Sequence, residues 1–316
     1  MLISGRVAEL HPPHLGAINP DEGYTDFYRE VCFHGGIPDT SFFPRMIQRW
    51  GSSTQEIEDL ETEVRIHPFF DAFWESKRAQ LEKVTCPAYV VASWQDQGLH
   101  TRGTLEGWKK IQSKEKWLEC HGRKVPYSQE SDSLQKWAFY YLPEQLEKQR
   151  AFFDRFLKGK KDTGVEKWPK VILEIRDGFY KGVFREEKEF PLSRAQYKRL
   201  YLDAENNALI PDVPSHESVA KYDGLGSGPG IHRAEFDIQF KEETEITGYM
   251  SAKLFMETTD SDDMHVFVTL WKLDKDKQPV GMTYYAQVRS NMFLQLRCSM
   301  KMDLLHVDGS KLHIGN

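Results

Sequence analysis

Two residues that could share a proton-transfer task follow separate apolar segments of the chain. Asp96 comes directly after the apolar run 88–94, and His121 comes directly after the shorter run 116–120. An aspartate that fixes the tautomer of a histidine, which then acts as general base, forms the back half of a Ser-His-Asp relay. In α/β-hydrolases the aspartate precedes the histidine along the chain, and this pair has that order. The alternative is that Asp96 is a turn former or a helix N-cap, because a Gln-Gly pair follows it.

The segments around this pair are typical of a parallel sheet that is covered by helices. Strands and helices are predicted to alternate, in the order 88–94 (strand), 99–111 (helix), 116–120 (strand) and 143–157 (helix). In an open sheet of this kind, functional side chains gather beyond the carboxyl ends of the strands. The separation of Asp96 and His121 corresponds to one crossover helix plus one strand. We therefore expect the two side chains to reach the same edge of the sheet.

The nucleophile of such a relay is not apparent in the sequence. An α/β-hydrolase needs a G-x-S-x-G elbow upstream of the aspartate, and the chain contains no such motif. The sequence His34-Gly35-Gly36 is similar to an esterase oxyanion motif, but it lies in a segment rich in aromatic and turn residues. We predict that these three residues form a turn.

The rest of the chain divides into segments that differ in composition and in their predicted secondary structure. The aromatic-rich segment 23–84 interrupts the alternation and predicts an insertion or cap. After the linker 159–164, short strand-like runs separated by Gly, Pro, Asp and Asn predict a β-sandwich over 165–287. From about residue 288 this alternation is lost, and no element is predicted there.

Composition excludes several classes of protein. With 40% hydrophobic residues, 8 tryptophans and a net charge of −6, the chain can bury a core and has no basic block for nucleic acid. It has no apolar run of membrane-spanning length and no secretory leader, which predicts a cytoplasmic protein. Its cysteines match neither a zinc nor a redox spacing and are expected to be reduced thiols (Cys32, Cys86, Cys120 and Cys298). No metal or organic cofactor is implied.

Five segments together resemble the cocaine-esterase-like hydrolases, which are also classed with the X-Pro dipeptidyl-peptidases. They are HPPHLGAINPDEGYTDFYRE (11–30), HGGIPDTSF (34–42), HPFFDAFW (67–74), PAYVVASWQDQGLHTRGTLEGW (87–108) and KWLECHGR (116–123). The resemblance runs in order over most of residues 6–287. It implies the C-terminal part of an α/β-hydrolase domain over 1–160, with a helical cap inserted at about 23–84. A jelly-roll, galactose-binding-like β-sandwich over 161–316 would follow, incomplete after about 287.

The resemblance also assigns residues to roles. Asp96 of SWQDQG is similar to the triad aspartate and His121 of ECHGR to the triad histidine. Aromatic residues of the insertion and the strand end would contact a small-molecule ester or peptide substrate, with Trp50, Trp74 and Trp94 as candidates. Core packing is the alternative for these aromatics. The implied activity is serine-dependent hydrolysis of an ester or a peptide. Acyl preference and oligomeric state are left open.

Two departures from the family pattern lead to further expectations. The resemblance implies that Met1 follows shortly after the catalytic serine, so the chain is expected to be a fragment that lacks the nucleophile. The segment Val-Pro-Tyr-Ser-Gln-Glu-Ser-Asp-Ser-Leu-Gln (125–135) interrupts a run that is continuous in the family, which an unspliced intron would explain. The alternative function is therefore a catalytically inactive hydrolase remnant that serves as a binding or interaction module.

Overall fold

The computed structural model divides the chain into two compact units. It describes residues 2–40, 58–94, 99–122, 140–178, 181–224, 232–259, 261–262, 264–280, 293–301 and 311–315. Unit 1 comprises Met1–Ile175 and Gly182–Lys188, and unit 2 comprises Arg176–Lys181 and Glu189–Asn316. The predicted domain roles of 1–160 and 161–316 stay predictions.

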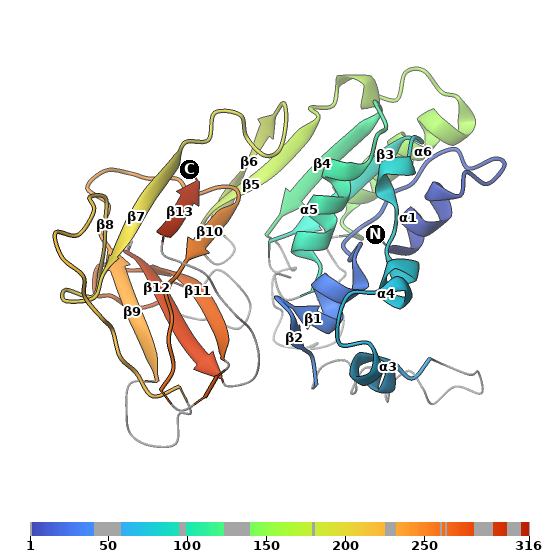
Figure 1. Ribbon diagram of the computed structural model, residues 1–316. Coiled ribbons are helices and arrows are strands. Elements are labelled where there is room, and N and C mark those ends of the chain that lie inside the picture. Colours follow the sequence, from blue (N-terminus) through green and yellow to red (C-terminus); the bar gives the residue numbers. More distant parts are fainter. Residues whose placement is uncertain are drawn as a thin grey trace, which may run out of the picture. The chain divides into compact units, whose positions relative to one another are not determined.

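Unit 1 is built around a four-stranded sheet (Figure 1). Its strands lie in the order β3 (Ala88–Ser93), β4 (Lys116–His121), β5 (Val171–Gly178) and β6 (Lys181–Glu187). The pairs β3–β4 and β4–β5 are parallel. Every residue of β3 is buried, as expected of a parallel strand that is covered on both faces.

Helices cover this sheet where the sequence predicted them. Helix α5 (Thr101–Lys110) forms the crossover between the parallel strands β3 and β4 and packs against β3. Helix α6 (Pro143–Lys158) begins with proline in its first turn and ends at Gly159, which has the left-handed φ of 68° that favours glycine. The strands and helices predicted for residues 88–157 are thereby confirmed. The N-terminal helix α1 spans Leu2–Glu9.

One hydrophobic cluster joins α6 to the sheet. Phe152 of α6 is completely buried and packs with Tyr89 and Val91 of β3 and Trp117 of β4. Residues 89, 91 and 117 lie on one face of the sheet, because their register pairs Tyr89 with Trp117 and Val91 with Glu119. His121 follows two residues after Glu119 on β4, so it lies on the same face of the sheet as this cluster.

The predicted insertion has its own small aromatic core. Its described elements are a π-helical turn (Tyr28–Cys32), β1 (Phe33–His34), β2 (Ile37–Pro38), α3 (Leu60–Ile66), α4 (Ala72–Lys77) and a 3-10 turn (Leu81–Lys83). Phe27, Tyr28, Phe33 and Trp74 pack together in its core.

The sequence His34-Gly35-Gly36 forms a turn, as predicted. It connects β1 to β2, and the amide of Gly36 donates a hydrogen bond of 3.1 Å to the carbonyl of Phe33. Both glycines have a left-handed φ, 64° at Gly35 and 89° at Gly36, which is the conformation that glycine adopts without steric penalty.

Unit 2 is rich in strands, in agreement with the predicted strand-like runs. Seven strands form one sheet in the order β10 (Met250–Lys253), β13 (Lys311–Gly315), β7 (Tyr197–Asp203), β8 (Ala208–Ile210), β9 (Arg233–Ile238), β12 (Phe293–Lys301) and β11 (His265–Leu273). Leu200, Leu209 and Phe236 are the buried residues of its hydrophobic cluster.

A short 3-10 turn in unit 1 (Val165–Lys167) precedes β5.

The sequence predicts no element after about residue 288, and the structure forms the strands β12 and β13 there. Strand β12 pairs antiparallel with β9 and β11, and β13 pairs antiparallel with β7 and β10. Positions 294, 296, 298 and 300 are in fact Leu, Leu, Cys and Met, which is an alternating pattern. β12 pairs with the preceding strand β11 and also with the more distant β9, and both partners of β13 are distant in the sequence. Their order in the sheet therefore depends on pairing that no local pattern reveals.

Candidate active site

The centre of the candidate site is His121, the last residue of β4. Its parallel partner in the ladder is Ser93, the last residue of β3. His121 is 3% exposed and Ser93 is 1% exposed, so both strand ends are buried. Asp96 lies three residues beyond the end of β3 but outside the described residues. The predicted contact between Asp96 and His121 therefore stays a prediction.

The main chain around His121 is held by two neighbouring strands. The amide of Trp94 donates a hydrogen bond of 2.8 Å to the carbonyl oxygen of His121. On the other side, the amide of Gly122 donates a 2.6 Å hydrogen bond to the Oε2 atom of Glu174 on β5. Both bonds hold the peptide group between His121 and Gly122, one from the β3 side and one from β5, so the placement of His121 is defined by more than its own strand.

Glu174 was not predicted from the sequence. Its side chain is 1% exposed, and burying a carboxylate is unfavourable unless hydrogen bonds or charges compensate it. The signal that could have revealed it is the acidic residue within the apolar strand sequence VILEIR. A carboxylate in a buried strand next to the strand of a candidate catalytic histidine is a candidate member of the site.

The start of α5 is attached to the same strand end. The hydroxyl of Thr101 donates a 2.5 Å hydrogen bond to the carbonyl of Ser93. Thr101 is the first residue of α5 and is itself buried. This hydrogen bond therefore joins two described residues, Ser93 and Thr101, that come before and after Asp96 in the sequence.

A second buried carboxylate, Glu119, lies two residues before His121 on β4. It accepts hydrogen bonds from the hydroxyl of Tyr89 (2.6 Å), from Nε2 of Gln145 (2.9 Å) and from Nζ of Lys148 (2.6 Å). Burial first, and then the adjacent charge of Glu119, raise the pKa of Tyr89 well above its ordinary value. The hydroxyl of Tyr89 therefore stays protonated and acts as a donor.

Asp21 adds a third carboxylate near this face of the sheet. It pairs with Val91 of β3 through a parallel bridge. Burial first, and then the charges of Glu22 and Glu119, raise the pKa of Asp21 to about 7. Asp21 therefore changes its charge near neutral pH, which is unusual for an aspartate.

The predicted substrate-contacting tryptophans lie in different settings. Trp50 is outside the described residues. Trp74 is 0% exposed in the aromatic core of the insertion, which indicates a packing role. Trp94 is half-buried, and its Nε1 atom donates a 3.0 Å hydrogen bond to the carbonyl of Glu174. Trp94 is the one of the three that the structure places beside His121, and substrate contact stays a prediction for all three.

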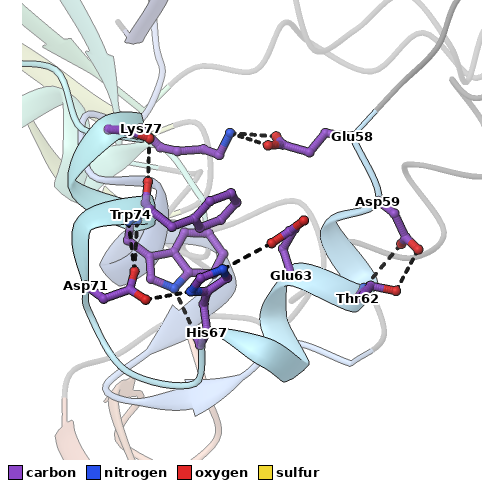
Figure 2. Close-up of polar contacts among 10 residues, drawn as sticks. Glu58, Asp59, Thr62, Glu63, His67, Asp71, Trp74 and Lys77 are labelled. Atoms are coloured by element: carbon purple, nitrogen blue, oxygen red, sulfur yellow. Dashed lines mark hydrogen bonds and ion pairs between the residues drawn. The ribbon is translucent and has the colours of Figure 1, made fainter.

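A separate aspartate–histidine pair lies in the insertion (Figure 2). Nδ1 of His67 is 2.5 Å from Oδ2 of Asp71, and Nε2 of His67 is 3.4 Å from Oε2 of Glu63. Asp71 is also the N-cap of α4, where it accepts hydrogen bonds from the amides of Phe73 and Trp74. The hydrogen bond from His67 is the main cause that lowers the pKa of Asp71.

This second pair is built to hold two short helices together. The carbonyl of His67 accepts a 2.8 Å hydrogen bond from Nε1 of Trp74, as Figure 2 shows. The ring of His67 stacks on Phe73 with a centroid distance of 4.5 Å. Both ring nitrogens therefore face carboxylates that belong to the helix ends. Such an arrangement stabilises the end of α3 and the start of α4 and contains no nucleophile.

Among the residues that the structure describes, no group of three or more His, Cys, Asp or Glu side chains could hold a metal ion. Within the same residues, no helix is long and apolar enough to cross a membrane. Three of the four cysteines are described with side chains and are free thiols (Cys32, Cys86 and Cys120).

These elements define a mixed α/β unit, with candidate acid–base residues at the ends of parallel strands, and a β-rich unit after it. Residues 45–123 match the X-Pro dipeptidyl-peptidase family S15, and residues 163–302 match the X-Pro dipeptidyl-peptidase C-terminal non-catalytic domain. Together the two matches cover more than half of the chain. No curated protein matches it.

Solved structures agree with this assignment. Two crystal structures of a CocE/NonD family hydrolase from Staphylococcus aureus are 36% and 35% identical to the chain, with TM-scores of 0.80 and 0.79. Both matches cover 98% of this chain. The chain therefore belongs to the family of the X-Pro dipeptidyl-peptidases and CocE/NonD hydrolases, as the resemblance implied. An aminopeptidase from the marine sediment archaeon Thaumarchaeota archaeon covers 86% of this chain and 50% of its own, at 15% identity and a TM-score of 0.51, and shares the fold alone.

The chain is shorter than these relatives. It spans 60% and 61% of the two Staphylococcus aureus chains.

Proposed function

We propose that this chain carries the aspartate–histidine half of a serine hydrolase that acts on a small-molecule ester or peptide. The observation that carries the proposal is the buried position of His121 at the carboxyl end of β4, beside the end of the strand that leads to Asp96. Membership of a hydrolase family supports it. Carboxyl ends of parallel strands are where open α/β sheets gather functional residues.

In the proposed reaction His121 is the general base. Its neutral imidazole removes the proton of a serine hydroxyl as that oxygen attacks the acyl carbon, and it then protonates the leaving group. Water, activated by the same imidazole, releases the acyl group from the serine. Asp96 would accept a hydrogen bond from the other ring nitrogen and would stabilise the imidazolium that forms in each half-reaction.

The proposal assigns no nucleophile to this chain. The sequence contains no G-x-S-x-G elbow, and the relatives are longer than the matched region. Only Asp96 and His121 are given catalytic roles here. Trp94 is the proposed substrate contact that the geometry favours most, because its indole lies at the same strand end, while Trp50 and Trp74 are weaker candidates.

We also propose a domain organisation for the chain. The segment 23–84 would be a helical cap inserted in the C-terminal part of an α/β-hydrolase domain over 1–160. The β-rich residues 161–316 would form a jelly roll of the galactose-binding type. The match of residues 163–302 to a C-terminal domain of this family supports that extension. The proposed reaction requires no metal or organic cofactor.

The second candidate function is a binding or interaction module without catalytic activity. The observation that favours it is the match of residues 163–302 to a domain described as non-catalytic, together with the missing elbow motif. In this case the fold of unit 1 would persist while His121 performs no chemistry.

The test uses the purified 316-residue chain and its His121→Ala variant. Hydrolysis of 4-nitrophenyl butyrate and of Gly-Pro-4-nitroanilide is followed from pH 5 to 9. In parallel, the intact mass is measured after exposure to a fluorophosphonate, which labels activated serines. Circular dichroism of both proteins establishes that they are folded.

We expect slow ester hydrolysis in which the neutral imidazole of His121 activates water directly, since the proposal assigns no serine to this chain. This activity should require His121 and should fall as pH drops through the pKa of its imidazole. We expect no fluorophosphonate adduct. A one-equivalent adduct that disappears in His121→Ala would support the hydrolase but overturn the assignment of only half of the relay to this chain. Folded protein with no turnover, or with turnover indifferent to His121, would overturn the proposal in favour of the binding module.

A further inference from the structure

We propose that Glu174 is a positioning residue for His121, which it holds through the main-chain amide of Gly122 and stabilises, as imidazolium, by its negative charge. This inference rests on the proposed function, because it concerns the same candidate base. It adds a second carboxylate, from β5, to the one expected from Asp96. The two carboxylates would then act from different strands.

The first argument is the way the β4–β5 ladder ends. Leu118 pairs with Val171 and Cys120 with Leu173, and the amide of Leu118 donates to the carbonyl of Lys170. In a parallel ladder the donors of one strand recur at every second residue. The next donors after Leu118 in this pattern are Cys120 and then Gly122. Continuation of the pattern would direct the Gly122 amide to the carbonyl of Glu174.

The observed bonds depart from this pattern. The Gly122 amide donates instead to the side-chain carboxylate of Glu174, at 2.6 Å, and the carbonyl of Glu174 accepts from Nε1 of Trp94, at 3.0 Å. The same Trp94 donates its main-chain amide to the carbonyl of His121. The ladder is thus replaced, directly after His121, by bonds that involve the side chains of Glu174 and Trp94.

The second argument is the position of the carboxylate relative to His121. Continued by one residue, the register of β4 and β5 pairs His121 with Glu174, and paired residues of neighbouring strands share a face at a spacing of about 4.8 Å. Both residues are buried, at 3% and 1% exposure. The two side chains therefore lie on the same face of the sheet on adjacent strands, and a neighbouring carboxylate in a buried setting favours the protonated form of a histidine.

The third argument is that the fold leaves room for this carboxylate at Gly182 of β6. A Cβ atom at Gly182 would lie 2.9 Å from Oε1 of Glu174 and 2.8 Å from the carbonyl oxygen of Ile175. Neither approach is tolerated by a real Cβ atom, so an alanine at this position would have to displace the Glu174 side chain or the β5 backbone. Gly182→Ala therefore moves the carboxylate without removing its charge.

Other charged groups near this strand end have different settings. Glu119 lies two residues before His121 on β4, but Nζ of Lys148 is 2.6 Å from its Oε2 atom and offsets its charge. Asp21 and Glu22 follow the edge of β3, where the amide of Glu22 donates to the carbonyl of Val91. Glu174 differs from these groups in its described hydrogen bond to the amide of Gly122, the residue that follows His121. Glu119→Gln is thus a matched control for the loss of a buried carboxylate from this region.

The test measures the pKa of His121 by NMR titration of the imidazole in the isotope-labelled chain. The His121 signal is assigned by its loss in His121→Ala. Wild type is compared with Glu174→Gln, Gly182→Ala and Glu119→Gln. The thermal midpoint of each protein is recorded, because a merely structural role would change this midpoint and leave the pKa of His121 where it was.

We expect Glu174→Gln to lower the pKa of His121 by about one pH unit, which is the low end of the effect of a neighbouring opposite charge. Gly182→Ala should lower the pKa by less, and Glu119→Gln should leave it nearly unchanged. An unaltered pKa in a folded Glu174→Gln protein would overturn the proposal. If that variant does not fold, an unaltered pKa in Gly182→Ala would overturn it.

The readout does not depend on turnover. If Glu174→Gln lowers the pKa of His121 in a protein that hydrolyses nothing, this inference is preserved and the proposed function is refuted. If turnover requires His121 but Glu174→Gln leaves the pKa of His121 unchanged, the proposed function is preserved and this inference is refuted.

Discussion

The main-chain amide of Trp94 donates a hydrogen bond of 2.8 Å to the carbonyl oxygen of His121. Because the indole of the same residue donates to Glu174 within β5, Trp94 links the ends of β3 and β4 to the middle of β5. The residue thus connects the segment that carries Asp96 to the strand that carries His121. The geometry of the candidate site depends on this connection more than on any single strand.

Replacement of Trp94 by phenylalanine tests this connection. Trp94→Phe keeps an aromatic ring but removes the donor to the carbonyl of Glu174. Glu174 is buried, and loss of this hydrogen bond to its carbonyl should cost about 1–2 kcal/mol in the free energy of unfolding. Chemical denaturation would measure this loss. A variant as stable as wild type would show that the indole hydrogen bond contributes nothing to the strand end.

Gly103 is expected to resist substitution although it lies within a helix. Alanine normally stabilises a helix by about 1 kcal/mol relative to glycine. At Gly103 of α5 an added Cβ atom would lie 2.7 Å from the backbone Cα of Tyr24 and would also meet the carboxylate of Glu30. Gly103→Ala should therefore lower the free energy of unfolding by roughly 2 kcal/mol.

Gly5 of α1 provides the comparison for Gly103. There the added Cβ atom would meet the end of the Leu81 side chain at 2.5 Å, and a leucine can adjust where a backbone cannot. Gly5→Ala should cost less than Gly103→Ala in the same denaturation experiment. Equal costs at the two positions would contradict the importance of the backbone contact at Tyr24.

Removing only Lys148 from its ion pair with Glu119 should lower the free energy of unfolding more than removing both charges. Lys148→Met leaves the buried Glu119 carboxylate with only Tyr89 and Gln145 as hydrogen-bond donors. We expect a loss of about 2–3 kcal/mol, somewhat below the usual range because Lys148 is partly exposed.

The double variant Glu119→Gln/Lys148→Met removes both charges. It should recover more than about 1 kcal/mol relative to Lys148→Met alone, since no uncompensated charge is left in the core. A double-mutant cycle by urea denaturation measures this coupling. Strictly additive losses would show that the two side chains do not interact in the folded protein.

The raised pKa of Asp21 predicts the pH dependence of stability. Its pKa is about 7 in the folded protein and 3.8 in the reference state. The folded state therefore holds this proton more tightly, and the stabilisation from this group is lost as pH rises from about 4 to about 7. The slope approaches 1.4 kcal/mol per pH unit at most.

The Asp21→Asn variant lacks this proton. Its free energy of unfolding, relative to wild type, should therefore increase by a few kcal/mol between pH 5 and pH 8. Asp154→Asn is the control, because hydrogen bonds from Lys158 and Lys160 lower the pKa of Asp154 to about 2. Asp154 is ionised throughout that range, so its difference from wild type should stay constant. A constant difference for Asp21→Asn as well would contradict the raised pKa.

Local pattern was sufficient to predict β3 and β4, which are two of the four strands in the sheet of unit 1. Residues 88–92 are apolar because β3 is buried on both faces, and the helix that follows has the length of a crossover. The position of His121 at a strand end follows from the same pattern. Family resemblance then supplied the role of the histidine, which spacing alone could not distinguish from a structural one.

Contacts between distant segments could not be predicted in this way. Glu174 meets Gly122 because β5 lies beside β4 in the sheet, although |i−j| is 52 for the two residues. The strand β12 pairs with β9 and the strand β13 pairs with β7, and both partners come much earlier in the sequence. In both cases the decisive information is strand order, which periodicity does not contain.

The central claim is that Asp96 holds His121 as the base of a hydrolase, and the ring proton of His121 tests it most directly. A histidine that donates Nδ1–H to a carboxylate gives a proton resonance far downfield of the amides. We predict this resonance for His121, lost in Asp96→Ala and in His121→Ala and retained in Asp71→Ala, which disrupts only the His67 pair. A His121 ring without this resonance, or a resonance that persists in Asp96→Ala, would contradict the account.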